Sequence, residues 1–168
     1  MTPNGLQKTW IRILLTGLTV TMMILIFLFS TEPAERSDRT SGHLSMTVIT
    51  MLHPDYESYT AEQKETLYAD VQHYVRKTAH FTEYLILGVL IRLCLESWFG
   101  TRHLLNPLSW AAGTVYACTD ELHQLIIDGR SGQISDVLLD SCGVLIGVLL
   151  TMLIRRNCER RRKQKSCP

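Results

Sequence analysis

The sequence predicts an all-α integral membrane protein with four transmembrane helices and an amphipathic surface helix before the second span. Apolar residues make up 46% of the 168-residue chain and are gathered in blocks. A span needs roughly 20 mostly apolar residues to cross a hydrocarbon core of about 30 Å. The formal net charge of +1 hides a segregation of acidic and basic residues along the chain. This pattern indicates the lipid bilayer as a partner and no nucleic acid.

Residues 13–29 are the clearest span, because they carry no charge and follow the basic residues Lys8 and Arg12. A cleaved signal peptide also begins with positive charge and is the alternative. Leu28 before Ser30 fits the small-residue rule for a cleavage site poorly. We therefore expect residues 1–30 to form a retained N-terminal transmembrane anchor.

Residues 31–75 are expected to form an extracytoplasmic linker, since they hold eight acidic residues and three basic ones. Within them, residues 44–52 are moderately apolar, which leaves open a membrane-surface helix or a buried strand. Thr60 and Gln63 match a capping box. Apolar residues then recur at helical spacing from Leu67, so we expect an amphipathic surface helix that leads into the second span.

Residues 76–154 are expected to form the membrane core, with spans at about 78–99, 104–127 and 134–154. The uncharged part of the middle span, residues 104–119, gives a helix of roughly 24 Å at 1.5 Å per residue. The polar stretch 120–124 is therefore expected near the outer boundary of the bilayer. In the last span, Gly143 and Gly147 permit a close helix contact.

Charge indicates the topology. Residues 155–168 form a basic tail, which the positive-inside rule assigns to the cytoplasm. Four spans then return the chain to the side on which it began, so both termini are expected inside. Arg92 and Glu96, four residues apart near the inner boundary, are interpreted as a local ion pair whose side chains snorkel toward the interface.

This topology brings polar residues from three spans and one loop to the same extracytoplasmic end. Ionisable residues beside a bilayer are costly and are candidates for a functional site. The candidate catalytic residues are His80, Glu83, Asp120, Glu121 and His123. The candidate ligand-binding residues are Lys77, Gln124, Arg130, Asp136 and Asp140.

These residues fall in ordered motifs: Arg76-Lys77-x-x-His80-Phe81-x-Glu83-Tyr84, Thr119-Asp120-Glu121-x-His123-Gln124, Gly129-Arg130, and Asp136 with Asp140 before Gly143 and Gly147. Over about residues 76–150 the chain resembles the VanZ-like family of bacterial multi-pass membrane proteins, named after a teicoplanin-resistance protein. The resemblance implies a protein of the bacterial cytoplasmic membrane with a link to glycopeptide resistance. It implies no catalytic mechanism.

Three functions remain open from the residues alone. An enzyme acting on a lipid-linked envelope molecule would use His80 or His123 as a general base, with nearby carboxylates orienting it or binding a divalent cation. Lys77 and Arg130 would then hold a phosphate or carboxylate. A non-catalytic protein would bind or shield an envelope precursor or the glycopeptide with the same residues. A structural ion network would only stabilise helix packing.

Overall fold

The computed structural model describes residues 5–31, 34–127 and 132–165, and this part of the chain consists of helices joined by short turns. It contains no strand within those ranges, so the all-α prediction is confirmed. Three helices are long and apolar enough to cross a membrane: residues 7–30 of α1 (Gly5–Ser30), all of α3 (Ala61–Phe99), and residues 134–162 of α5 (Ile134–Lys165). The remaining helices are α2 (Ala34–Leu52), the 3-10 turn η1 (Tyr56–Ser58) and α4 (Leu105–Gln124).

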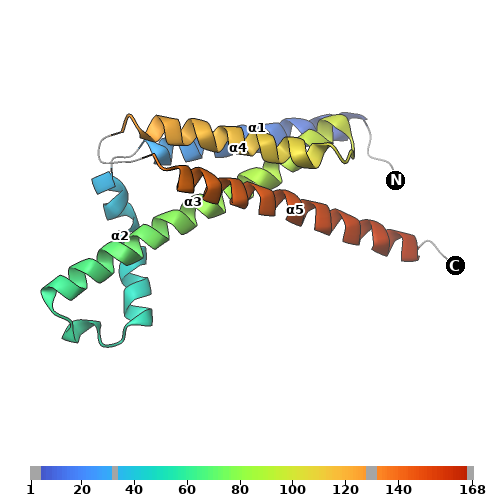
Figure 1. Ribbon diagram of the computed structural model, residues 1–168. Coiled ribbons are helices and arrows are strands. Elements are labelled where there is room, and N and C mark those ends of the chain that lie inside the picture. Colours follow the sequence, from blue (N-terminus) through green and yellow to red (C-terminus); the bar gives the residue numbers. More distant parts are fainter. Residues whose placement is uncertain (1–4, 32–33, 128–131, 166–168) are drawn as a thin grey trace.

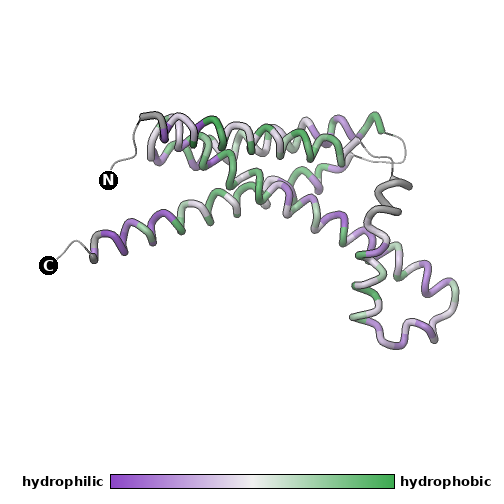
Figure 2. The backbone as a smooth tube through the Cα atoms, turned by 180° about the vertical axis from the view of Figure 1, so that it is seen from behind, coloured by the Kyte–Doolittle hydropathy of each residue, from purple (hydrophilic) through white to green (hydrophobic). Residues whose placement is uncertain are grey.

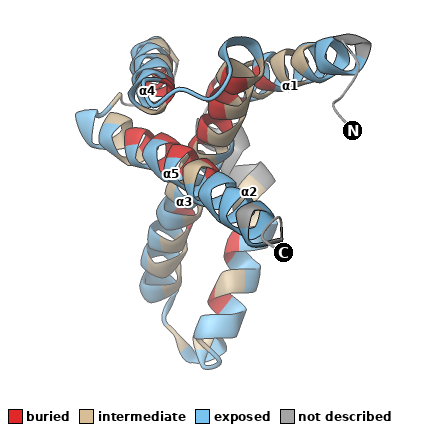
Figure 3. Ribbon diagram, turned by 90° about the vertical axis from the view of Figure 1, so that its right-hand side faces the viewer, coloured by how far each residue is buried: buried red, intermediate tan, exposed pale blue. Residues whose placement is uncertain are grey.

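The helix α3 is the centre of the arrangement, because it packs against α1, α2, α4 and α5. Figure 1 shows α5 crossing α3, with α4 and α1 beyond this crossing and α2 beside the first half of α3. Apolar residues follow α1 and the middle of α5, whereas the C-terminal end of α5 is hydrophilic (Figure 2). Buried residues gather where α3 and α5 meet (Figure 3).

The segment between the first two apolar helices is itself helical. Residues 44–52 belong to α2, so the helical alternative for them is confirmed and the buried strand is wrong. The physical reason is local: Ser45, Thr47 and Thr50 bond back to backbone carbonyls three or four residues earlier, which satisfies their hydroxyls within a helix.

The predicted helix start at Thr60 is confirmed. Thr60 Oγ1 accepts a hydrogen bond from the Gln63 amide at 3.3 Å, and Gln63 Oε1 accepts one from the Thr60 amide at 2.9 Å. The helix then runs for 39 residues without a break, about 58 Å at 1.5 Å per residue. Because it is one rod, longer than the roughly 30 Å of a bilayer core, the predicted separate surface helix is not confirmed.

Three glycines bring α3 and α5 into backbone contact. A Cβ at Gly143 would lie 2.6 Å from the Phe81 carbonyl oxygen, and one at Gly147 would meet the Leu85 carbonyl oxygen. On the α3 side, a Cβ at Gly88 would meet the Val144 carbonyl oxygen. The predicted close contact through Gly143 and Gly147 is therefore confirmed, and it sets the position of every α5 side chain relative to α3.

The helix α4 has 20 residues and is not among the three candidate spans, so the four-span prediction is only partly supported. It nevertheless packs against α3 and α5, and Ala117 joins the apolar core with Tyr84, Leu87, Val144 and Val148. Residues 155–165 of the basic tail are helical as well, because α5 continues to Lys165.

Candidate functional site

A buried polar cluster lies between the middle of α3, the end of α4 and the start of α5. Asp140 is 2% exposed, Asp120 is 3% exposed and Tyr84 is fully buried. Glu121 and Gln124 of α4 are also buried. We call Tyr84, Asp120, Glu121, Gln124 and Asp140 the acidic cluster. The glycine contact of α5 with α3 brings Asp140 to this place, because Asp140 lies one turn before Gly143 and two turns before Gly147.

The hydrogen bonds of the acidic cluster are incomplete. Gln124 Nε2 donates to Asp120 Oδ2 at 3.2 Å, and the Gln133 amide donates to Glu121 Oε2 at 2.9 Å. The buried atom Asp140 Oδ1 has no hydrogen-bond partner within the described ranges, whereas the Tyr84 hydroxyl interacts with the Asp120 carboxylate. Buried polar groups in native proteins are nearly always bonded, so Asp140 Oδ1 indicates a place for water or a ligand.

The cluster gathers several carboxyl groups. Asp140 lies within electrostatic reach of Glu121, Asp120, Asp136 and Glu83, in decreasing order of effect. The Tyr84 hydroxyl is close to both Asp120 and Asp140. Carboxylates at this density repel one another unless protons, water or a cationic group intervene.

Two polar pairs form the rim of the cluster. Lys77 Nζ of α3 donates a hydrogen bond to Asp136 Oδ1 of α5 at 2.7 Å, with side chains 29% and 26% exposed. His80 Nδ1 lies 3.7 Å from Glu83 Oε2, one turn along α3. Lys77, His80 and Glu83 therefore lie together on α3, as their spacing predicts, and the rim remains partly open to solvent.

Two candidate site residues, His123 and Arg130, are not seen among the residues of the acidic cluster. His123 lies against α1, where its ring stacks on Phe27 with centroids 4.6 Å apart. Its Nε2 is buried without a hydrogen-bond partner in the described part of the chain. Arg130 lies outside the described residues, so its predicted role as an anion ligand stays a prediction.

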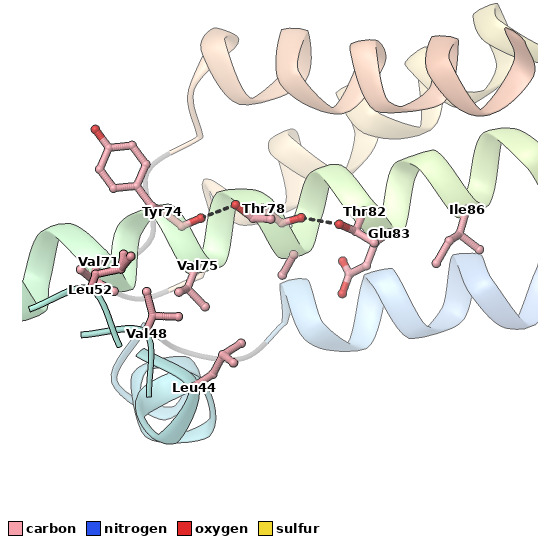
Figure 4. A pocket seen from close by; sticks show the side chains of 11 residues that line it. Leu44, Val48, Leu52, Val71, Tyr74, Val75, Thr78, Thr82, Glu83 and Ile86 are labelled. Atoms are coloured by element: carbon pink, nitrogen blue, oxygen red, sulfur yellow. Dashed lines mark hydrogen bonds between the residues drawn. The ribbon is translucent and has the colours of Figure 1, made fainter. Parts of the chain in front are cut away.

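An apolar groove begins beside the rim and runs between α2 and α3. Its volume is about 720 Å³, and it is lined by Leu44, Val48 and Leu52 of α2 and by Val71, Val75 and Ile86 of α3, among others. Figure 4 shows the α2 side chains near Val71 and Val75, with Glu83 and Ile86 further along α3 beside α1. Glu83 therefore lines the apolar groove and neighbours the acidic cluster at the same time.

The described side chains contain no group of three or more His, Cys, Asp or Glu residues arranged to hold a metal ion. The arrangement of these side chains therefore does not support the divalent cation that was considered from the sequence.

The sequence reasoning missed two parts of this site. The spacing of Tyr84, four residues after His80, predicts that it shares a helix face with His80 and Glu83, but Tyr84 is not among the candidate site residues. The groove could not be found in this way, because residues 44–52 and 71–86 meet only through the turn back at residues 53–60.

Long apolar helices and a polar cluster enclosed between three of the helices define an all-α membrane protein. A sequence model of the family described as VanZ/LLP1 matches residues 15–155, which include most of α1, all of α2 to α4, and α5 up to its first tail arginine. The chain therefore belongs to the VanZ-like family. Neither curated proteins nor solved structures give a match.

Proposed function

We propose that this VanZ-like protein binds an amphiphilic cell-envelope ligand at the extracytoplasmic face of the bacterial cytoplasmic membrane. The polar head of the ligand would meet the acidic cluster and its rim. The apolar chain would occupy the groove between α2 and α3. A lipid-linked envelope precursor and a lipidated glycopeptide such as teicoplanin both have this chemistry.

The position of Glu83 carries the proposal. One face of α3 offers apolar side chains to the groove, and Glu83 lines that groove within electrostatic reach of the Asp140 carboxyl group. A ligand with both an apolar and a polar part can satisfy both surfaces at once. A purely structural network would need the polar pairs but would not need the adjoining groove.

The unpartnered carboxyl oxygen of Asp140 indicates which head groups fit. A carboxyl oxygen accepts hydrogen bonds from hydroxyl, amide or ammonium groups. Asp140 Oδ1 is therefore suited to such donors on a sugar or peptide head group. An ammonium donor would make a charge-assisted bond, about twice as strong as a neutral one.

The proposed topology supports an outer-face site. We propose that α4 crosses the membrane with α1, α3 and α5, which would place both termini in the cytoplasm. Arg155, Arg156, Arg160, Arg161 and Arg162 of α5 then lie inside. The acidic cluster lies at the start of α5, far from these arginines, and the groove lies beside the first half of α3; both are on the extracytoplasmic side in this arrangement.

The binding test uses the full-length protein in lipid nanodiscs with two probes, teicoplanin and a lipid-linked peptidoglycan precursor, each with and without its lipid chain. We expect Asp120→Asn with Asp140→Asn to weaken binding of both forms at least tenfold. Val75→Trp should fill the groove and weaken only the lipidated forms.

Val115→Trp is the matched control, because Val115 is 64% exposed on α4 and does not line the groove. If neither probe binds, or if Val75→Trp and Val115→Trp have the same effect, the proposed division between head and chain is wrong.

A catalytic variant of this function is favoured by one observation. His80 and Glu83 are within 3.7 Å at the partly open rim, which resembles a general base with an orienting carboxylate. Mass spectrometry of each probe after incubation separates the two functions: an altered product that His80→Gln abolishes indicates an enzyme, whereas unaltered ligand indicates a binding protein.

A further inference from the structure

A second polar site lies at the other end of the bundle, where the turn between α3 and α4 meets the middle of α5. It is a pocket of about 260 Å³ lined by Arg92, Arg102, Arg155, Arg156 and Asn106 among others. We call it the basic pocket. It is separate from the acidic cluster, with which it shares no residue.

A buried ion network forms the wall of the basic pocket. Arg92, 4% exposed, donates from Nε to Asn106 Oδ1 at 2.7 Å and from Nη1 to Glu96 Oε2 at 2.9 Å. The other oxygen of Glu96 accepts bonds from Arg155 Nη1 at 2.9 Å and Thr101 Oγ1 at 2.8 Å. The Arg92–Glu96 ion pair is therefore confirmed, but its side chains are buried and do not snorkel.

The charges of the network do not balance. Four arginines line the pocket, and the acidic residues beside them are Glu96 and Glu159. Both oxygens of Glu96 are already used by its partners. Arg102 and Arg156 are exposed and form no ion pair with any residue in the described ranges. The pocket therefore carries excess positive charge beside a rigid, preorganised guanidinium.

Aromatic side chains indicate that this end lies at the level of lipid head groups. Trp98 is half exposed, and the Arg12 guanidinium lies 5.3 Å from the centroid of its ring. Arg12 Nε also donates to the Ser97 carbonyl at 2.8 Å. Exposed tryptophan with arginine is typical of the membrane interface.

Exposed apolar residues are sequence neighbours of two residues that line the pocket. Leu104, next to the pocket residue His103, is 77% exposed, and Ile154, next to Arg155, is 62% exposed. A free anion would use only the arginines. An anionic lipid would use the arginines with its head group and this apolar surface with its chains.

We propose that the basic pocket binds the phosphate of an anionic phospholipid, with Arg102, Arg156 and the Arg92 network holding the head group. Guanidinium groups bind phosphate oxygens in a bidentate geometry. Basic pockets between transmembrane helices are suited to such head groups, with about 1 kcal/mol for each basic residue near the surface.

The test uses the full-length protein and native mass spectrometry after exchange into equal amounts of phosphatidylglycerol and phosphatidylcholine. The wild type should retain phosphatidylglycerol preferentially and gain thermal stability from it. Arg102→Gln with Arg156→Gln should lower this retention about thirtyfold. These two side chains make no ion pair with a described residue, so folding should be preserved.

The matched control is Arg160→Gln with Arg161→Gln, which removes the same charge from exposed arginines of α5 that do not line the pocket. It should change retention by less than about twofold. Equal loss in the two double variants would overturn the proposal in favour of diffuse attraction, as would a wild type without preference. Displacement of phosphatidylglycerol by excess inorganic phosphate would overturn the lipid assignment; retention in its presence supports it.

Discussion

Lys77 Nζ donates a hydrogen bond to Asp136 Oδ1 at 2.7 Å, and this bond joins the middle of α3 to the first turn of α5. It neutralises one of the carboxylates that surround Asp140. The rim of the site is therefore locally balanced, whereas the acidic cluster behind it is not. This contrast separates groups that hold the helices together from groups available to a ligand.

The Lys77–Asp136 pair should contribute little to stability, because both side chains are more than a quarter exposed. A double-mutant cycle with Lys77→Met and Asp136→Asn should give a coupling energy of at most about 1 kcal/mol in thermal or denaturant unfolding. Lys64 and Glu57, 3.3 Å apart with Glu57 93% exposed, serve as a control pair without measurable coupling. A coupling of several kcal/mol would mean that the pair is a main support of the fold.

Asp140→Asn should raise the thermal stability of the protein while lowering its affinity for the ligand. The substitution removes an ionisable group from a buried set of carboxyl groups that repel one another, and it nearly keeps the side-chain shape. Binding sites often carry such a cost in stability. Asp136→Asn is the matched control and should not stabilise, because it breaks the bond to Lys77. Marked destabilisation by Asp140→Asn would instead favour the structural network.

Gly147→Ala should destabilise the protein by about 1–3 kcal/mol, since the new Cβ would meet the Leu85 carbonyl oxygen and force α5 away from α3. Gly17→Ala in α1, where nothing lies within 4 Å of the added Cβ, should be neutral or slightly stabilising. Thermal unfolding of the two variants side by side checks this. Similar midpoints would argue against a tight α3–α5 contact.

Glu96→Gln should cost about 3–5 kcal/mol, because it leaves the buried guanidinium of Arg92 without its counter-charge. Glu159→Gln, at an exposed position, should change the free energy of unfolding little. Denaturant unfolding of both variants provides the comparison. If Glu96→Gln were as mild as Glu159→Gln, water or another group must compensate Arg92.

Reporter fusions should decide whether α4 crosses the membrane. With four spans, a reporter after Lys165 or within residues 100–103 is cytoplasmic, whereas one near Asp38 or within residues 128–131 is extracytoplasmic. If residues 100–103 and 128–131 report the same side, α4 does not cross. In that case the two ends of the chain lie on opposite sides and the shared outer-face site must be reassigned.

The sequence by itself predicted correctly those features that depend on residues close together in the chain. The charge-free run 13–29, the capping box at Thr60 and the pair of Arg92 with Glu96 each depend on residues within a few turns of one helix, and the structure confirms each of them. The motif around Asp120 and the glycine pair of α5 likewise identified the family and the helix faces that meet.

The tertiary structure decided everything that depends on distant segments. Only the packing of α5 across α3 buries Asp140 beside Asp120 and Tyr84 and adds Arg155 to Glu96, and only the contact of α4 with α1 turns His123 toward Phe27. Only the return of α3 along α2 creates the apolar groove. Periodicity fixes which side of a helix is polar, but the partner of that side is set by glycine contacts and by segments that lie far along the chain.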